Sequence, residues 1–115
     1  MGDRGNIKVG KIYLYTHWGG GEIEKVLHKA LSRRKRWDDE PYLTRIIFCE
    51  LIEGDLDGET GYGISTEILD NENNIFEVDV DKQEVKELEF DTEKIIGKWT
   101  FEEFVTKEPI IEALE

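Results

Sequence analysis

The sequence has few of the residues that build covalent or metal-based sites. A single cysteine, Cys49, excludes an intrachain disulfide and a cysteine-rich metal site. Two histidines, His17 and His28, are too few and too far apart in sequence for a histidine metal centre. No apolar run approaches the roughly 20 residues that a membrane-spanning helix needs, and the first residues lack the apolar stretch of a secretion signal. We therefore expect a cytoplasmic protein with no metal, no cofactor and no membrane contact.

Positive charge is also scarce, and it is unevenly placed. The 115 residues contain 15 Lys and Arg against 27 Asp and Glu, for a formal net charge of -12. Residues 1–49 hold ten of the basic residues and six of the acidic ones, so the second half is strongly acidic. Because an acidic surface repels phosphate backbones, we expect no direct binding to duplex nucleic acid. A basic protein is the macromolecular partner that this charge favours.

The first half of the chain shows two short strands and two amphipathic helices. Residues 6–9 and 12–16 flank Gly10-Lys11, which is typical of a two-residue hairpin turn with glycine first. A helical apolar stripe follows, formed by Ile23, Val26, Leu27, Ala30 and Leu31. Asp39 and Pro41 predict the start of a second helix, whose wide apolar face would pack on the sheet or in a homodimer.

The second half predicts three more strands and a short terminal helix. Alternating apolar residues indicate a strand that includes residues 61–68 and a hairpin that joins residues 76–81 to the segment ending at Phe90. With a turn at residues 82–84, Val78 would lie opposite Leu88, and Glu77 would lie beside Glu89 on an acidic, solvated face. Thr100 and Glu103 match a capping box.

Together these patterns predict an α+β fold. We expect a mostly antiparallel sheet of about five strands, with the two main helices packed on one face and a short helix at the C-terminus. Residues 1–113 would form a single globular domain, because a chain of this length supports one core. Residues 114–115 resemble the scar of an expression tag.

The most distinctive motif is the segment Thr16-His17-Trp18-Gly19-Gly20-Gly21, between a strand and a helix. Glycines let backbone N–H groups approach a ligand at a helix N-terminus, so an anionic or nucleotide-like group could bind there. His17 would donate a hydrogen bond or a proton, and Trp18 would stack. The alternative is a tight turn in which Trp18 packs as a lid on the core.

A second glycine motif, Thr60-Gly61-Tyr62-Gly63-Ile64-Ser65, leaves one face of a strand without large side chains. Such a face receives a ligand, another backbone, or aromatic rings such as those of Tyr13 and Tyr15. If the strands are adjacent, the two motifs would line one pocket. The residues that we assign to this ligand-binding site are His17, Trp18, Gly19, Gly20, Trp37, Arg45, Gly61, Gly63 and Ser65.

Several strings of the chain resemble a family of small bacterial and phage proteins to which no activity is assigned. They are YLYTHWGG at residues 13–20, WDD at 37–39, YLTRIIF at 42–48, TGYGIS at 60–65 and DNE at 70–72. The resemblance covers roughly residues 2–80 and implies no catalytic or binding residue. The phage-like contexts of the family imply, by association, a role in mobile-element biology.

These observations favour a non-enzymatic binding module for a small polar or nucleotide-like ligand. Two alternatives stay open. The acidic half could bind a basic protein, as a nucleic-acid mimic or in an anti-defence role. Alternatively, His17 could act as the base of a small hydrolase or transferase, because histidine titrates near neutral pH.

Overall fold

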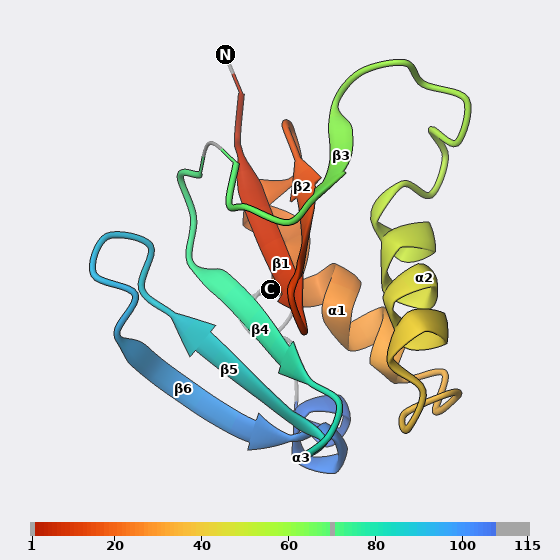
Figure 1. The fold of residues 1–115 in the computed structure, drawn as a ribbon, viewed down its shortest axis with the longest axis vertical. Coiled ribbons are helices and arrows are strands. Elements are labelled where there is room, and N and C mark those ends of the chain that lie inside the picture. Colours follow the sequence, from red (N-terminus) through yellow and green to blue (C-terminus); the bar gives the residue numbers. More distant parts are fainter. Residues whose placement is uncertain (1, 70, 108–115) are drawn as a thin grey trace.

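A computed structural model describes residues 2–69 and 71–107 of the chain (Figure 1). The expectation for residues 114–115 therefore lies outside the described residues. The elements, in chain order, are β1 (Gly5–Val9), β2 (Ile12–Thr16), a 3-10 turn (Gly20–Glu22), α1 (Ile23–Leu31), α2 (Glu40–Leu51), β3 (Tyr62–Ser65), β4 (Ile75–Asp79), β5 (Glu84–Leu88), β6 (Ile95–Thr100) and α3 (Phe101–Thr106).

The strands form one sheet in the order β3-β2-β1-β4-β5-β6. Only β1 and β4 run parallel, and every other neighbouring pair is antiparallel. The predicted α+β class and the mostly antiparallel sheet are therefore confirmed. The sheet has six strands rather than about five, because residues 95–100 form β6, which the sequence pattern did not reveal.

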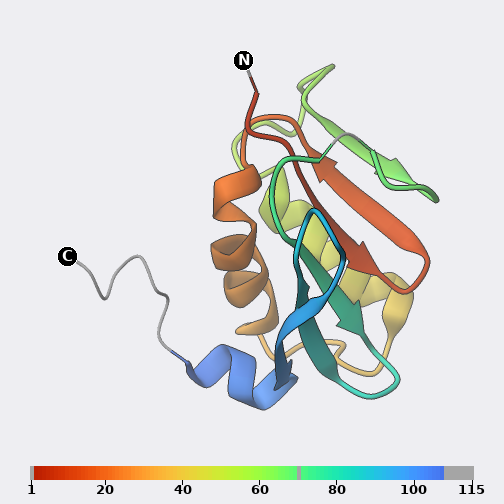
Figure 2. The same ribbon diagram turned by 90° about the vertical axis from the view of Figure 1, so that its left-hand side faces the viewer.

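Both main helices lie on one face of the sheet, as predicted (Figure 2). Asp39 caps α2 by accepting a hydrogen bond from the Tyr42 N–H, and Pro41 occupies the first turn. At α3, the Thr100 side chain accepts from the Glu103 N–H while the Glu103 carboxylate accepts from the Thr100 N–H. The predicted capping box is therefore present with both of its hydrogen bonds.

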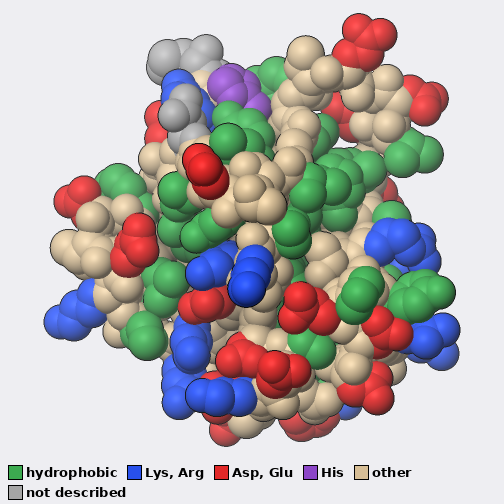
Figure 3. Space-filling view, viewed as in Figure 1, with side chains coloured by type: hydrophobic (Ala, Val, Ile, Leu, Met, Phe, Trp, Pro, Cys, Tyr) green, Lys and Arg blue, Asp and Glu red, His purple; other side chains and the backbone are tan. Residues whose placement is uncertain are grey.

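The register between β4 and β5 differs from the prediction. Val78 lies opposite Val85 instead of Leu88, and Glu77 lies opposite Lys86 instead of Glu89. The reason is a tight turn that ends at Gln83, which adopts a φ of 53°, so that β5 starts at Glu84. The uncovered face of the sheet is consequently not uniformly acidic, and Figure 3 shows basic and acidic side chains side by side on it.

A single hydrophobic core lies between the sheet and the helices. Ile7, Leu14 and Val78 from the sheet, and Leu27 from α1, are completely buried. Phe104 of α3 closes the lower end of the core and packs edge-on against the ring of Phe76. Among residues 2–69 and 71–107, no helix is long and apolar enough to span a bilayer.

Candidate functional site

The two glycine motifs lie side by side in the structure. β2 pairs with β3 so that Tyr15 lies opposite Gly63. Just beyond β2, the backbone N–H of His17 donates to the carbonyl oxygen of Gly61 at 2.8 Å. The sheet therefore brings His17 and Trp18 next to the strand that carries Gly61, Gly63 and Ser65.

Side chains of the protein itself fill the space between these motifs. A Cβ at Gly61 would overlap the six-membered ring of Trp18, and Gly61 has a φ of +99° that favours glycine. At Gly63, an added Cβ would meet Leu69 at 3.8 Å and Tyr15 at 4.0 Å. Trp18 is 53% exposed, so its ring covers Gly61 from the solvent side and is not a lid on the core. Aromatic packing over glycine is thus what the geometry shows at Gly61.

His17 is held between a tyrosine and the N-terminal segment. Its Nδ1 lies 2.9 Å from the Tyr15 hydroxyl, and its carbonyl oxygen accepts from the Asp3 N–H at 2.7 Å. The Trp18 indole packs edge-on against the imidazole at 5.2 Å between ring centroids. The group that orients the imidazole is a neutral phenol, whereas a catalytic histidine is usually oriented by a carboxylate.

Two of the predicted site residues lie elsewhere. The Trp37 Nε1–H donates to the carbonyl oxygen of Leu31, at the C-terminal end of α1, and the indole packs edge-on against Phe101. The three glycines at residues 19–21, which we call the glycine bend, lie at the opposite end of α1. Trp37 is therefore far from His17 along this helix. Arg45 is exposed on α2.

The smaller predicted residues have local partners. The Gly19 N–H donates to the Thr16 hydroxyl at 3.0 Å, and the Ser65 hydroxyl accepts from the Glu67 N–H at 3.0 Å. These bonds shape the turn after β2 and the end of β3.

Gly20 marks a junction of three segments that are distant in sequence. Its N–H donates to the Asp3 carbonyl oxygen at 2.6 Å, and the next N–H, of Gly21, donates to the Asp3 carboxylate at 2.8 Å. The Asn73 side-chain amide donates to the same carboxylate at 2.9 Å and to the Arg4 carbonyl oxygen at 2.8 Å. The hydrogen bonds from Asn73 and Gly21 lower the pKa of Asp3 from its ordinary value.

This arrangement changes what the start of α1 can bind. The Asp3 carboxylate already accepts a hydrogen bond from the glycine bend, and Glu22 and Glu24 follow in the next residues. Carboxylates thus occupy the positive end of the helix dipole. A phosphate would meet these negative charges, so the geometry disfavours an anion at the glycine bend.

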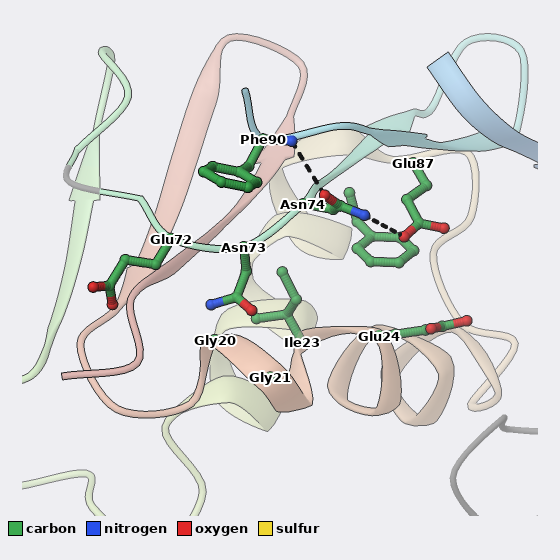
Figure 4. Close-up of a pocket in the computed structure, with 10 residues that line it drawn as sticks. Gly20, Gly21, Ile23, Glu24, Glu72, Asn73, Asn74, Glu87 and Phe90 are labelled. Atoms are coloured by element: carbon green, nitrogen blue, oxygen red, sulfur yellow. Dashed lines mark hydrogen bonds between the residues drawn. The ribbon is translucent and has the colours of Figure 1, made fainter. Parts of the chain in front are cut away.

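A pocket of about 340 Å³ opens on the other side of the bend (Figure 4). The start of α1 forms one wall, the segment 72–74 forms another, and β4, β5 and the β5–β6 turn complete it. The lining residues are Gly20, Gly21, Ile23, Glu24, Glu72, Asn73, Asn74, Phe76, Glu87 and Phe90. Ile23 and Phe76 are almost fully buried and belong to the apolar part of this lining.

The charged groups that line the pocket are three glutamates. Glu24 forms an ion pair with Lys107, and Glu72 accepts from the Arg4 backbone N–H at 2.9 Å. Glu87 accepts from the Asn74 side-chain amide at 2.9 Å and has no ion-pair partner among residues 2–69 and 71–107. The pocket therefore offers a carboxylate with only a neutral partner.

Phe90 adds an aromatic ring at the rim of the pocket. It is 49% exposed, and its backbone N–H donates to the Asn74 side-chain oxygen at 3.1 Å, so Asn74 holds both Phe90 and Glu87. A carboxylate and an exposed aromatic ring held by one amide can bind a cationic group. In the described part of the chain, no group of three or more His, Cys, Asp and Glu residues could hold a metal ion.

Sequence reasoning included Gly20 in the site but missed Asn73, Asn74, Glu87 and Phe90. In the sequence, the polar run at residues 70–74 indicates only a turn. It becomes a wall of the pocket because Asn73 lies against Asp3 and Gly20, a contact that the local sequence does not indicate. Comparison of the chain with protein-family models, with curated proteins and with solved structures finds no match.

Proposed function

We propose that this protein is a non-enzymatic binding module whose pocket beside the glycine bend binds a small polar ligand through a cationic group. The observation that carries the proposal is Glu87, an acid that faces the pocket and whose only partner in the described part of the chain is the Asn74 amide. A guanidinium or ammonium group could form an ion pair with Glu87 and lie against the ring of Phe90.

The electrostatics of the surroundings support a cation over a nucleotide. Three carboxylates line the pocket, and within the described ranges Lys107 pairs with Glu24 and Arg4 with Glu72, whereas Glu87 has no ion pair there. The net charge of -12 also opposes phosphate groups over the whole molecule. We therefore propose a cytoplasmic module that recognises an amine-bearing or guanidinium-bearing compound and no duplex nucleic acid.

Isothermal titration calorimetry with agmatine, and separately with adenosine monophosphate, tests this function. We expect agmatine to bind and adenosine monophosphate not to bind. Glu87→Gln should weaken agmatine binding about tenfold, because it removes the charge and leaves the shape. Asp81→Asn is the matched control, since it removes one negative charge at the β4–β5 turn, outside the pocket lining.

Three results would overturn the proposal. The first is an absence of heat from agmatine with the wild-type protein at millimolar concentration. The second is equal weakening by Glu87→Gln and Asp81→Asn, which would show that agmatine binding responds to the net charge and not to the pocket. The third is tighter binding of adenosine monophosphate than of agmatine, which would indicate an anion site.

A further inference from the structure

The strand β3 leaves one edge of the sheet free. It is the terminal strand of the sheet and pairs only with β2. In an antiparallel pair, successive residues direct their backbone N–H and C=O groups alternately toward the partner strand and away from it. The hydrogen bond from the His17 N–H to the Gly61 carbonyl oxygen shows that Gly61 is directed toward β2. The N–H and C=O groups directed toward β2 are therefore those of Gly61, Gly63 and Ser65. The N–H and C=O groups directed toward the free edge are those of Tyr62 and Ile64.

An apolar side chain beside this edge is left uncovered. Ile64 lies directly opposite Leu14, so the two side chains project from the same face of the sheet. Leu14 is completely buried under the helices, whereas Ile64 is 61% exposed. The helical layer therefore ends before it reaches β3 (Figure 1).

Acidic residues flank the strand at both ends. Glu59 precedes β3 and Glu67 follows it, and both are exposed. Neither has an ion-pair partner within the ranges 2–69 and 71–107, in contrast to Glu22, Asp39 and Glu50. Lys8, Lys11 and Thr66 line one shallow depression, so two lysines lie near the Glu67 end and the Glu59 end is the more negative.

We propose that the free edge of β3 receives an extended segment of a basic partner protein as an additional strand. The segment would bond with the backbone groups of Tyr62 and Ile64, cover the Ile64 side chain with an apolar residue, and place Lys or Arg opposite Glu59 and Glu67. This surface is separate from the pocket at Glu87, so the proposal does not depend on the proposed function.

Charge also distinguishes such a partner from a second copy of the chain. If two copies paired antiparallel about Gly63, Glu59 of one copy would lie opposite Glu67 of the other at both ends of the strand. Like charges directly opposite one another destabilise a strand pair. A segment with basic ends avoids this repulsion and neutralises both glutamates.

The test uses the full chain and a synthetic peptide with alternating valine and threonine and two lysines at each end. Binding is measured by fluorescence anisotropy of the labelled peptide. We expect binding that weakens about tenfold when the central backbone nitrogens of the peptide are methylated, because strand addition needs their N–H groups. A peptide with glutamate in place of lysine should bind at least tenfold more weakly.

Ile64→Pro tests the edge on the protein side. The N–H of Ile64 does not bond to β2, so proline removes a donor from the free edge only, a position that edge strands tolerate. Lys98→Pro on β6, the strand at the other edge of the sheet, is the matched control. The Phe101 N–H bonds to the Gln83 carbonyl oxygen, and the direction of the backbone groups alternates along β6, so the N–H of Lys98 also points to a free edge. We expect a loss of about tenfold for Ile64→Pro and none for Lys98→Pro.

Glu59→Lys should also weaken binding of the lysine-ended peptide. The loss of affinity should be larger at low salt than at high salt, because salt screens interactions between exposed charges. This variant and the methylated peptide keep the test decisive if a proline variant does not fold. Equal binding of the methylated and unmethylated peptides would overturn strand addition. An absence of peptide binding, or a wild-type dimer in sedimentation that Ile64→Pro dissociates, would overturn the basic partner.

Discussion

Replacing Gly20 by alanine tests the junction on which the pocket is built. A Cβ at this position would lie 2.6 Å from the Asp3 carbonyl oxygen and 2.8 Å from the Arg4 carbonyl carbon, and it would overlap the Asn73 amide nitrogen. Two of these neighbours are backbone atoms, which cannot rotate away as a flexible side chain can. The N-terminal segment must therefore move away from the glycine bend in the Gly20→Ala variant.

The size of the effect follows from three contributions. Forcing an extra carbon into a packed site costs about 1–3 kcal/mol. Displacing the Asp3 carbonyl oxygen weakens its hydrogen bond from the Gly20 N–H, a loss of about 1 kcal/mol. Alanine restores about 0.4–1 kcal/mol by restricting the unfolded chain. We expect a net loss of about 2 kcal/mol in the free energy of unfolding, or about 8 °C in Tm.

Urea denaturation, followed by tryptophan fluorescence and by far-ultraviolet circular dichroism, measures this loss. Gly21→Ala is the matched control, because a Cβ there would meet only the Asp3 carboxylate, at 3.1 Å, and a shift of that side chain by a few tenths of an ångström relieves the contact. We expect the control to change the free energy of unfolding by less than about 0.5 kcal/mol. If Gly20→Ala costs no more than Gly21→Ala, the close contact of the three segments is refuted.

Three further predictions concern stability. Thr100→Ala should lower the free energy of unfolding by about 1 kcal/mol in urea, because α3 loses the side-chain acceptor of its capping box; an unchanged urea midpoint would contradict the cap. Asp3 has a lowered pKa, so its contribution to stability is present above its ordinary pKa of 3.8 and is lost as the pH falls through the lower folded value. The difference in Tm between wild type and Asp3→Asn should accordingly shrink below about pH 4, and a constant difference would exclude the charge as its source. Gly54 has a φ of +86° and open space around it, so Gly54→Ala should cost about 1 kcal/mol from backbone strain alone; a stabilised variant would show that the loop adopts another conformation.

Local signals in the sequence predicted the helices well. The apolar stripe of α1, the Asp39 cap of α2 and the capping box of α3 each depend on residues within a few positions of one another. The adjacency that the sequence analysis made the condition for a shared pocket is present, since His17 bonds to Gly61, but the Trp18 ring lies over Gly61 where the pocket was expected. In each case the deciding contact is set by a short-range pattern or by a single strand pairing.

The β4–β5 register and the strand β6 could not be predicted from the alternation of apolar and polar residues in the sequence. The β4–β5 register depends on the positive φ of Gln83, a residue type with no preference for that conformation. A later start of β5 would give an equally regular alternation of apolar and polar residues in the sequence. β6 has Gly97 at its centre, and the Trp99 ring lies over this glycine, so the strand lacks the regular alternation that marks a half-buried strand.

The pocket could not be predicted because its walls are distant in sequence. Asp3, Gly20 and Asn73 are brought together by the β1–β4 pairing, and no periodicity in the chain encodes that parallel contact. The glycine bend was correctly singled out as a place of close backbone approach. The approaching group is a neighbouring segment of the same chain, whereas the sequence suggested a ligand.

The single parallel contact also divides the molecule along its chain. Strands β1, β2 and β3 all come from residues before 66, and β4, β5 and β6 all come from residues after 74, so each half of the sheet is a continuous piece of polypeptide. The hairpins β1–β2, β4–β5 and β5–β6 join strands that are close in sequence and can associate quickly, whereas β2 must find β3 across both helices and β1 must find β4 across a longer loop closure still. We therefore expect the joining of the halves to be a slow event in folding, and we expect two separately produced fragments cut between β3 and β4 to reassemble at the β1–β4 pairing.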